Sequence, residues 1–106
     1  MPAIGHVTKT ENGFKGNLST LSISADIEVV PNRDKANENQ PDYRVFAGRV
    51  EIGAGWVRKS ERSGNEYTSL SFAAPEFGQR KLYANLGQAA GQDDPDVFAI
   101  IWNPED

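Results

Sequence analysis

One stretch decides the fold of this chain: residues 43–72, which read YRVFAGRVEIGAGWVRKSERSGNEYTSLSF. It contains two segments in which apolar and polar side chains alternate, separated by a glycine-containing turn. Alternation with a period of two is typical of a strand with one buried face. The apolar positions are Val50, Ile52, Ala54 and Trp56 in the first segment and Thr68, Leu70 and Phe72 in the second. The stretch therefore predicts an antiparallel hairpin.

The register of this hairpin follows from the need to place both apolar sets on one face. Opposed residues of an antiparallel pair point to the same side of the sheet. A three-residue loop, Arg62-Ser63-Gly64, sets Trp56 opposite Leu70 and meets this need. We therefore predict that loop, with Gly64 in the left-handed conformation that glycine adopts without steric cost. In this register the indole ring of Trp56 belongs to the core.

The outward face of the hairpin is then rich in cations and carries one aromatic ring. A tyrosine among Lys and Arg on an exposed sheet can stack on a base and contact phosphates. The same composition also fits a solvated face whose long cations cover apolar neighbours. The candidate nucleic-acid-binding residues, on this face or at its ends, are Arg49, Arg58, Lys59, Arg62, Tyr67 and Ser69.

The rest of the chain continues the pattern of short strands. Residues 6–18 predict a hairpin about Asn12-Gly13, with Val7, Phe14 and Leu18 on its inner face. Residues 21–30 and 81–86 alternate as strands, and residues 97–102 are apolar on both faces, as in a central or doubly covered strand. Between them we expect a mobile polar loop at 31–42, an acidic loop at 87–96 and an acidic tail at 103–106. The fold class is all-β: an antiparallel meander of about seven or eight short strands closing into a barrel or a sandwich.

Length and composition bound the class of protein. The chain has 106 residues, enough for one domain with a single core, which we assign to residues 1–106. It has no cysteine, which excludes disulfides and thiolate chemistry and is compatible with a reducing cytosol. No apolar run approaches the roughly 18 residues of a membrane span, and no signal-peptide core follows Met1.

Charge is unevenly distributed along the chain. The formal net charge is -4, which argues against a generic nucleic-acid binder. Residues 41–85, however, hold seven basic and five acidic side chains. Residues 86–106 hold five acidic side chains and no basic one. The sequence is therefore compatible with a local basic surface beside an acidic C-terminal region.

Signals for catalysis or a cofactor are weak. The single histidine, His6, is expected to be solvated and has no partner nearby in sequence. Gly53 and Gly55 lie inside a predicted strand, so they indicate a bulge or a sharp bend rather than a nucleotide loop. The run at residues 93–96 lacks the spacing and distal Glu of an EF-hand calcium loop. We expect no enzyme activity, no metal site and no cofactor.

Several short motifs in order along the chain carry a resemblance to a known family. They are IG at 4–5, KTENGFKG at 9–16, VPN at 30–32, PDYRVFAG at 41–48, EIGAGW at 51–56, YTSL at 67–70, LYANL at 82–86 and IIW at 100–102. Together they resemble the alphaproteobacterial domain-of-unknown-function family 736 (DUF 736). The resemblance implies a cytoplasmic accessory protein associated with mobile elements such as plasmids and conjugative elements. It carries over no activity, cofactor or catalytic residue.

Two functional hypotheses from different classes remain. The first is a non-enzymatic module that binds single-stranded nucleic acid through the hairpin face. The second is an acidic protein-interaction factor, such as an inhibitor or DNA mimic, that engages a basic protein. Its candidate residues are Asp93, Asp94, Asp96 and Trp102. Neither hypothesis involves a membrane, and the sequence leaves open whether the chain is a monomer or a homodimer.

Overall fold

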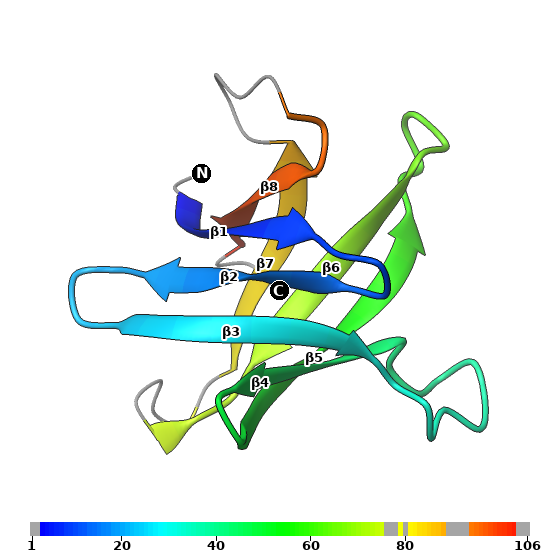
Figure 1. Cartoon of the computed structure of the whole chain (residues 1–106). Helices are drawn as coiled ribbons and strands as arrows, with labels where there is room; N and C mark the ends of the chain where they lie inside the picture. Colours follow the sequence, from blue (N-terminus) through cyan, green and yellow to red (C-terminus); the bar gives the residue numbers. More distant parts are fainter. Residues whose placement is uncertain (1–2, 76–78, 80, 89–93, 104–106) are drawn as a thin grey trace.

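Eight antiparallel strands close into a barrel in the computed structural model of the chain (Figure 1). The structure describes residues 3–75, 79, 81–88 and 94–103. Each strand pairs with its neighbours in sequence, and β1 pairs with β8 to close the wall. The strands are β1 (Ala3–Lys9), β2 (Phe14–Ser19), β3 (Ser24–Pro31), β4 (Tyr43–Ala47), β5 (Val50–Lys59), β6 (Glu66–Phe72), β7 (Leu82–Gln88) and β8 (Val97–Trp102). The predicted all-β meander is confirmed, in its barrel form.

The inward faces of the strands form one core. Within the described ranges, the buried core cluster consists of Ile4, Val7, Phe14, Leu18, Ile27, Val29, Val45, Leu70, Phe72, Ala84, Leu86 and Ile100. At one end, the ring of Phe14 contacts those of Tyr43 and Phe98 edge-on, at centroid distances of 6.0 and 5.6 Å. These rings close that end of the interior, as expected for a small barrel filled by its own side chains. In the described part of the chain, no helix has the length and hydropathy of a membrane span.

The N-terminal hairpin turns one residue earlier than its strongest turn signal predicts, which shifts the pairing register by two residues. Its loop is Glu11-Asn12, because Thr10 N donates to Gly13 O over 2.8 Å and Lys9 lies opposite Phe14. A Cβ on Gly13 would lie 1.9 Å from the carbonyl oxygen of Val29, so this glycine is needed for close packing against β3. A shift of two residues leaves the faces unchanged. The predicted inner face is accordingly confirmed.

The register predicted for the β5–β6 hairpin is wrong by one residue. Gly55 lies opposite Leu70 and Gly53 opposite Phe72, so β5 presents these two glycines to the interior. The cause is a bulge: the β4–β5 pairing shifts between Val45 and Phe46, which inserts one extra residue into β5. Beyond the bulge, Ala54 and Trp56 therefore face outward, and the prediction that Trp56 belongs to the core fails.

The loop at the tip of this hairpin also differs from the expected one. It has four residues, 61–64, because Ser60 N donates to Asn65 O over 2.9 Å. Gly64 N donates to Ser60 O, also over 2.9 Å, and Gly64 has a φ of 73°. The left-handed conformation expected of Gly64 is confirmed, whereas the three-residue loop is wrong.

The polar segment 31–42 is anchored at its base. Asn32 donates from its backbone N–H to Asp42 O (2.9 Å) and from its side chain to Pro41 O (2.9 Å). Asp42 N donates to Gly55 O (2.8 Å), while Asp42 Oδ2 accepts a hydrogen bond from Val57 N (2.8 Å). The two bonds of Asp42 continue the pairing along β5 beyond Tyr43, the first residue of β4. The expected mobility of the residues between Asn32 and Pro41 stays a prediction.

Candidate nucleic-acid interface

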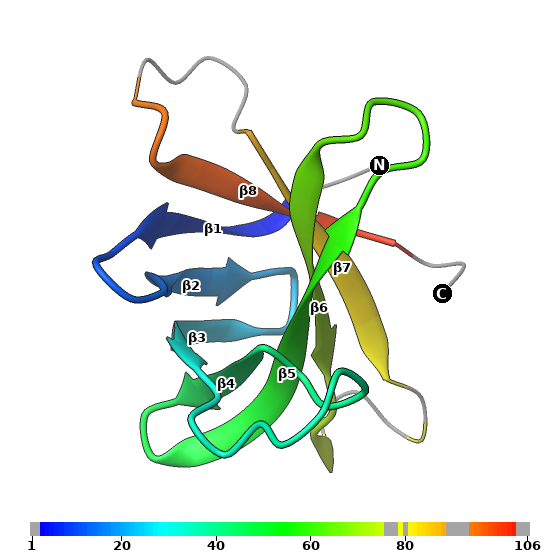
Figure 2. The ribbon, with the colours of Figure 1, turned by 90° about the vertical axis from the view of Figure 1, so that its right-hand side faces the viewer.

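The barrel wall opens between β6 and β7 at one end of the molecule. Their pairing runs from Phe72 opposite Leu82 to Ser69 opposite Asn85 and stops there. Beyond that point residues 66–68 pair only with β5, and residues 86–88 pair only with β8. Figure 2 shows the β5–β6 hairpin rising away from β7 and β8 at its tip. Each of the two strands thus has a free edge along the opening.

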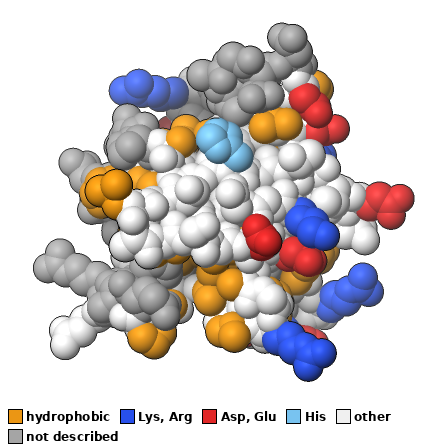
Figure 3. Space-filling view, turned by 60° about the vertical axis from the view of Figure 1, so that its left-hand side comes forward, with side chains coloured by type: hydrophobic (Ala, Val, Ile, Leu, Met, Phe, Trp, Pro, Cys, Tyr) orange, Lys and Arg blue, Asp and Glu red, His pale blue; other side chains and the backbone are white. Residues whose placement is uncertain are grey.

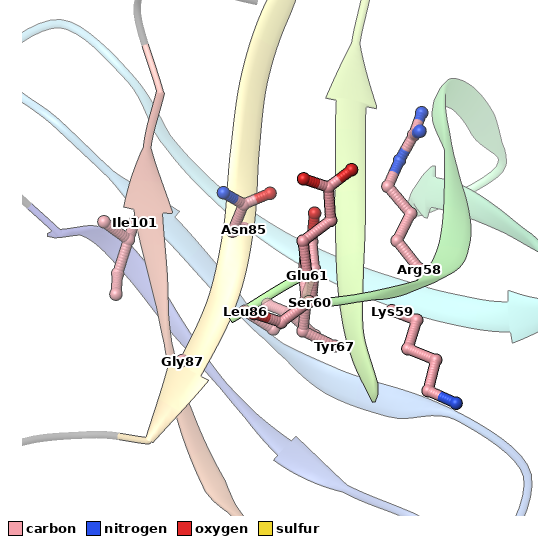
Figure 4. Close-up of a pocket in the computed structure, with 9 residues that line it drawn as sticks. All are labelled: Arg58, Lys59, Ser60, Glu61, Tyr67, Asn85, Leu86, Gly87 and Ile101. Carbon is pink, nitrogen blue, oxygen red and sulfur yellow. The ribbon is translucent and has the colours of Figure 1, made fainter. Parts of the chain in front are cut away.

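A surface groove of about 800 Å³ occupies this opening. The β5–β6 hairpin supplies one wall of the groove. The other wall, on the β7–β8 side, consists of Asn85, Leu86, Gly87 and Ile101. Figure 4 shows Glu61 on the side of the hairpin nearest Asn85, whereas the side chains of Arg58 and Lys59 extend away from Asn85. The hairpin residues that line the groove are Arg58, Lys59, Ser60, Glu61 and Tyr67.

Aromatic side chains flank the groove on the outer surface. Trp56 lies opposite Ser69 and Arg58 lies opposite Tyr67, so all four belong to the outward face of the hairpin. Trp56 and Tyr67 are diagonal neighbours, a separation of about 7–8 Å that aromatic side chains can bridge. Both rings are half-buried. Ser69 is only 7% exposed although it faces outward, so larger neighbours cover it.

A third ring lies further along the same outer face. Tyr83 is opposite Ser71, which is 6% exposed, and is itself half-buried. The sequence pattern wrongly placed Trp56 in the core, whereas it placed Tyr83 on the outer face of its strand without including it in the candidate site. The signal that could have found Trp56 is the Gly53-x-Gly55 pattern, because a bulge inverts the faces of every residue that follows it. We define the aromatic face as Trp56, Tyr67 and Tyr83.

The cations beside the groove form no ion pair with any residue that the structure describes. Within the described ranges, the salt bridges join Lys35 to Asp42 and Arg44 to Glu51, and none involves Arg58, Lys59 or Arg62. Arg58, Lys59 and Arg62 are exposed. Unpaired, solvated cations can contact phosphates without first breaking another interaction. We refer to these three residues as the hairpin cations.

Further along the outer face of the sheet, Arg44 neutralises the carboxylate of Glu51. Arg44 Nε and Nη2 donate to the two carboxylate oxygens of Glu51 over 2.7 and 2.9 Å. These hydrogen bonds lower the pKa of Glu51 and raise that of Arg44. The guanidinium also lies 5.2 Å from the ring centroid of Phe46. The pair is exposed, so it contributes little to stability.

The structure brings together only part of the predicted nucleic-acid site. Arg58, Lys59 and Tyr67 line the groove, with Arg62 in the hairpin tip, and Ser69 is buried beside Trp56. Arg49 lies in the β4–β5 turn, nine residues before Arg58 and therefore roughly 30 Å away along the strand. It does not belong to the groove.

The residues of the alternative acidic site are also separated. Asp94 and Asp96 are exposed at the start of β8, where Asp96 N donates to Asp94 Oδ1 over 2.9 Å. Trp102 ends the same strand, roughly 20 Å further on, and is 36% exposed. Asp93 lies outside the described residues. The aspartates and the tryptophan thus occupy opposite ends of the barrel.

On another face of the molecule, charges of both signs occur together. Figure 3 shows a face on which Lys or Arg and Asp or Glu side chains intermingle among uncharged groups. His6 is exposed, opposite Asn17 and Ala99, and the pale blue side chain in that view stands beside apolar ones. Among the described residues, no cluster of three or more His, Asp or Glu side chains could hold a metal ion.

Comparison with known proteins gives one match. The model of a family described as "Protein of unknown function (DUF736)" matches residues 3–105. No curated protein and no solved structure matches the chain. The match covers every strand of the barrel.

Proposed function

The chain belongs to the DUF736 family, whose function is unknown, and we propose from its own surface that it binds single-stranded nucleic acid. One observation carries the proposal: the unpaired hairpin cations stand beside outward-facing Trp56 and Tyr67 at the open end of the β5–β6 hairpin. Cations and flat rings on one exposed sheet are the two components that single-strand binding requires.

The rings select for unpaired bases. A base can stack on Trp56 or Tyr67 only if it has left its own stack, as it has in a single strand. Stacking of this kind contributes about 1–3 kcal/mol per base and tolerates any sequence. A duplex offers the surface only its phosphates, so it should bind more weakly. We infer a general preference for single strands without strong sequence specificity.

The hairpin cations supply the phosphate contacts. Three contacts to a single strand correspond to a slope of about -2 for log K against log salt concentration. The carboxylate of Glu61 lies in the same groove, and the chain carries a net charge of -4. Both features oppose a polyanion, so binding is confined to this surface and weakens quickly as salt rises.

A charge reversal with a distant control tests the proposal. The probe is fluorescence anisotropy of labelled single-stranded and duplex oligonucleotides, titrated at low and moderate salt. We expect the Arg58→Glu, Lys59→Glu double variant to weaken single-strand binding at least tenfold. Arg49→Glu, a control at the other end of β5 that reverses one charge instead of two, should change it by less than about twofold, apart from the long-range effect of net charge.

Two results would contradict the proposal. One is an absence of binding to any single strand at low salt. The other is a loss of binding free energy per reversed charge that is as large in Arg49→Glu as in the double variant, which would show that only net charge matters. In either case the acidic-factor hypothesis takes its place, and Asp94 and Asp96 become the residues to reverse in a search for a basic protein partner.

A further inference from the structure

Exposed apolar side chains gather at the end of the barrel away from the groove. The β2–β3 and β4–β5 connections and the ends of β6 and β8 lie there, whereas the β5–β6 tip lies at the other end (Figure 1). Leu21 is 109% exposed, Val50 is 64% exposed and Trp102 is 36% exposed. These are three of the four most exposed large apolar side chains in the described part of the chain. Such a cluster marks an interaction surface.

The turn that presents Leu21 is held rigidly. Thr20 N donates to Ile23 O over 2.8 Å, and Thr20 Oγ1 accepts from Ile23 N at 3.1 Å and from Ser22 N at 3.3 Å. Leucine is not a residue that turn geometry favours, since Gly, Pro, Asn, Asp and Ser dominate such positions. The local fold therefore does not account for Leu21. Because the backbone of the turn is already ordered, burial of Leu21 in an interface costs mainly the rotamer entropy of one side chain.

A largely apolar socket of about 380 Å³ lies beside this turn. Its volume is at the lower limit of ligand sites and exceeds that of a leucine side chain. Among the described residues, no charged side chain lines it. The lining residues are Leu18, Ser22, Ile23, Ser24, Ala25, Ala47, Val50, Ile52 and Ala74.

We propose that this end is a homodimer interface in which Leu21 of each copy inserts into the socket of the other. Leu21, the knob, and the socket lie at the same end of one chain, so a two-fold axis at that end can pair them reciprocally. Both copies carry a net charge of -4, so their contact is least opposed where no charged groups meet. The described lining of the socket meets that condition, and depletion of charge is typical of an interface core.

The test is sedimentation equilibrium of the full chain over a dilution series. We expect the wild type to dimerise and Leu21→Ser to raise the dimer dissociation constant at least tenfold, as loss of a buried anchor does. The matched control is Val57→Ser, which removes an apolar side chain of 41% exposure near the other end of the molecule. It should leave the dissociation constant unchanged.

A second variant distinguishes a specific contact from non-specific association. Ala74→Glu places a charge in the socket while keeping Leu21, so it should also dissociate the dimer. A mixture of the Ala74→Glu and Leu21→Ser variants retains one intact Leu21 and one intact socket. A heterodimer should form in this mixture, with a higher dissociation constant than the wild-type dimer. Three results would overturn the proposal: a wild type that remains monomeric throughout, a dimer unaffected by Leu21→Ser, or no heterodimer in the mixture. A socket that binds a small apolar ligand while the wild type stays monomeric counts as the first of these.

Discussion

Asp42 connects the polar segment 31–42 to β5 through one carboxylate. Its oxygens accept hydrogen bonds from Lys35 in the polar segment and from the backbone of Val57 in β5. The Lys35 contact is the larger cause of its lowered pKa, followed by the Val57 bond. Asp42 thereby fixes the base of residues 31–42 next to Trp56. The polar composition of that segment predicts a loop but not this attachment.

The lowered pKa of Asp42 makes the attachment dependent on pH. The unfolded value is about 3.9, so the stabilisation from the ionised group is present above that pH and is lost as pH falls through the lower folded-state pKa. We expect the free energy of unfolding of the wild type to decrease below about pH 4 and that of Asp42→Asn to decrease less. Chemical denaturation at a series of pH values measures both. Asp34→Asn, in the same segment, should follow the wild type; parallel curves for Asp42→Asn and wild type would refute the prediction.

The bulge in β5 decides which residues reach the surface. Val50 and Ile52 continue without interruption into Ala54 and Trp56 as one alternating series, so the sequence contains no break where the faces invert. The inversion arises because β4 pairs with β5 on both sides of one extra residue. Period-two patterns therefore predicted the strands and the inner face of Val7 and Leu18, but not the position of Trp56. The pairing of a neighbouring strand is information that a single segment lacks.

Glycine substitution in β5 tests this register. A Cβ on Gly53 would lie 2.0 Å from the carbonyl oxygen of Ser71, which is backbone and cannot yield easily. We expect Gly53→Ala to lower the free energy of unfolding by about 3 kcal/mol, at the upper end of overpacking effects. Ala54→Gly, on the outer face, should cost only about 0.5–1 kcal/mol.

Urea denaturation of the two variants provides the comparison. If Gly53 faced outward, as the uninterrupted alternation predicts, Gly53→Ala would instead raise stability slightly by lowering the entropy of the unfolded chain. An unchanged or raised free energy of unfolding would therefore contradict the bulge. Near-ultraviolet circular dichroism would verify that both variants keep the native packing of the aromatic rings.

At the scale of the whole molecule, the two proposed surfaces lie at opposite ends of one barrel. The groove and the hairpin cations stand beside the β5–β6 tip, and Leu21 and its socket lie at the other end. A dimer formed through the apolar end would leave both grooves free. Two grooves on one particle could then engage one strand together and raise its apparent affinity.

The site could be predicted from the sequence only in part. Charge distribution and the hairpin pattern identified Arg58, Lys59, Arg62 and Tyr67, because these residues are close together in sequence. The contribution of Asn85, Gly87 and Ile101 depends on where the β6–β7 pairing ends, which the closure of the whole barrel determines. Long-range pairing of this kind leaves no local signal.

The most direct test of single-strand binding is the fluorescence of Trp56. The chain has two tryptophans, so the Trp102→Phe variant reports on Trp56 alone. Titrating this variant with oligothymidylate at low salt should quench the emission saturably, because a base stacks on the indole. The quenching should disappear as salt rises and in the Arg58→Glu, Lys59→Glu background. Emission that stays constant throughout the titration would contradict the proposal that Trp56 and its neighbours bind single-stranded nucleic acid.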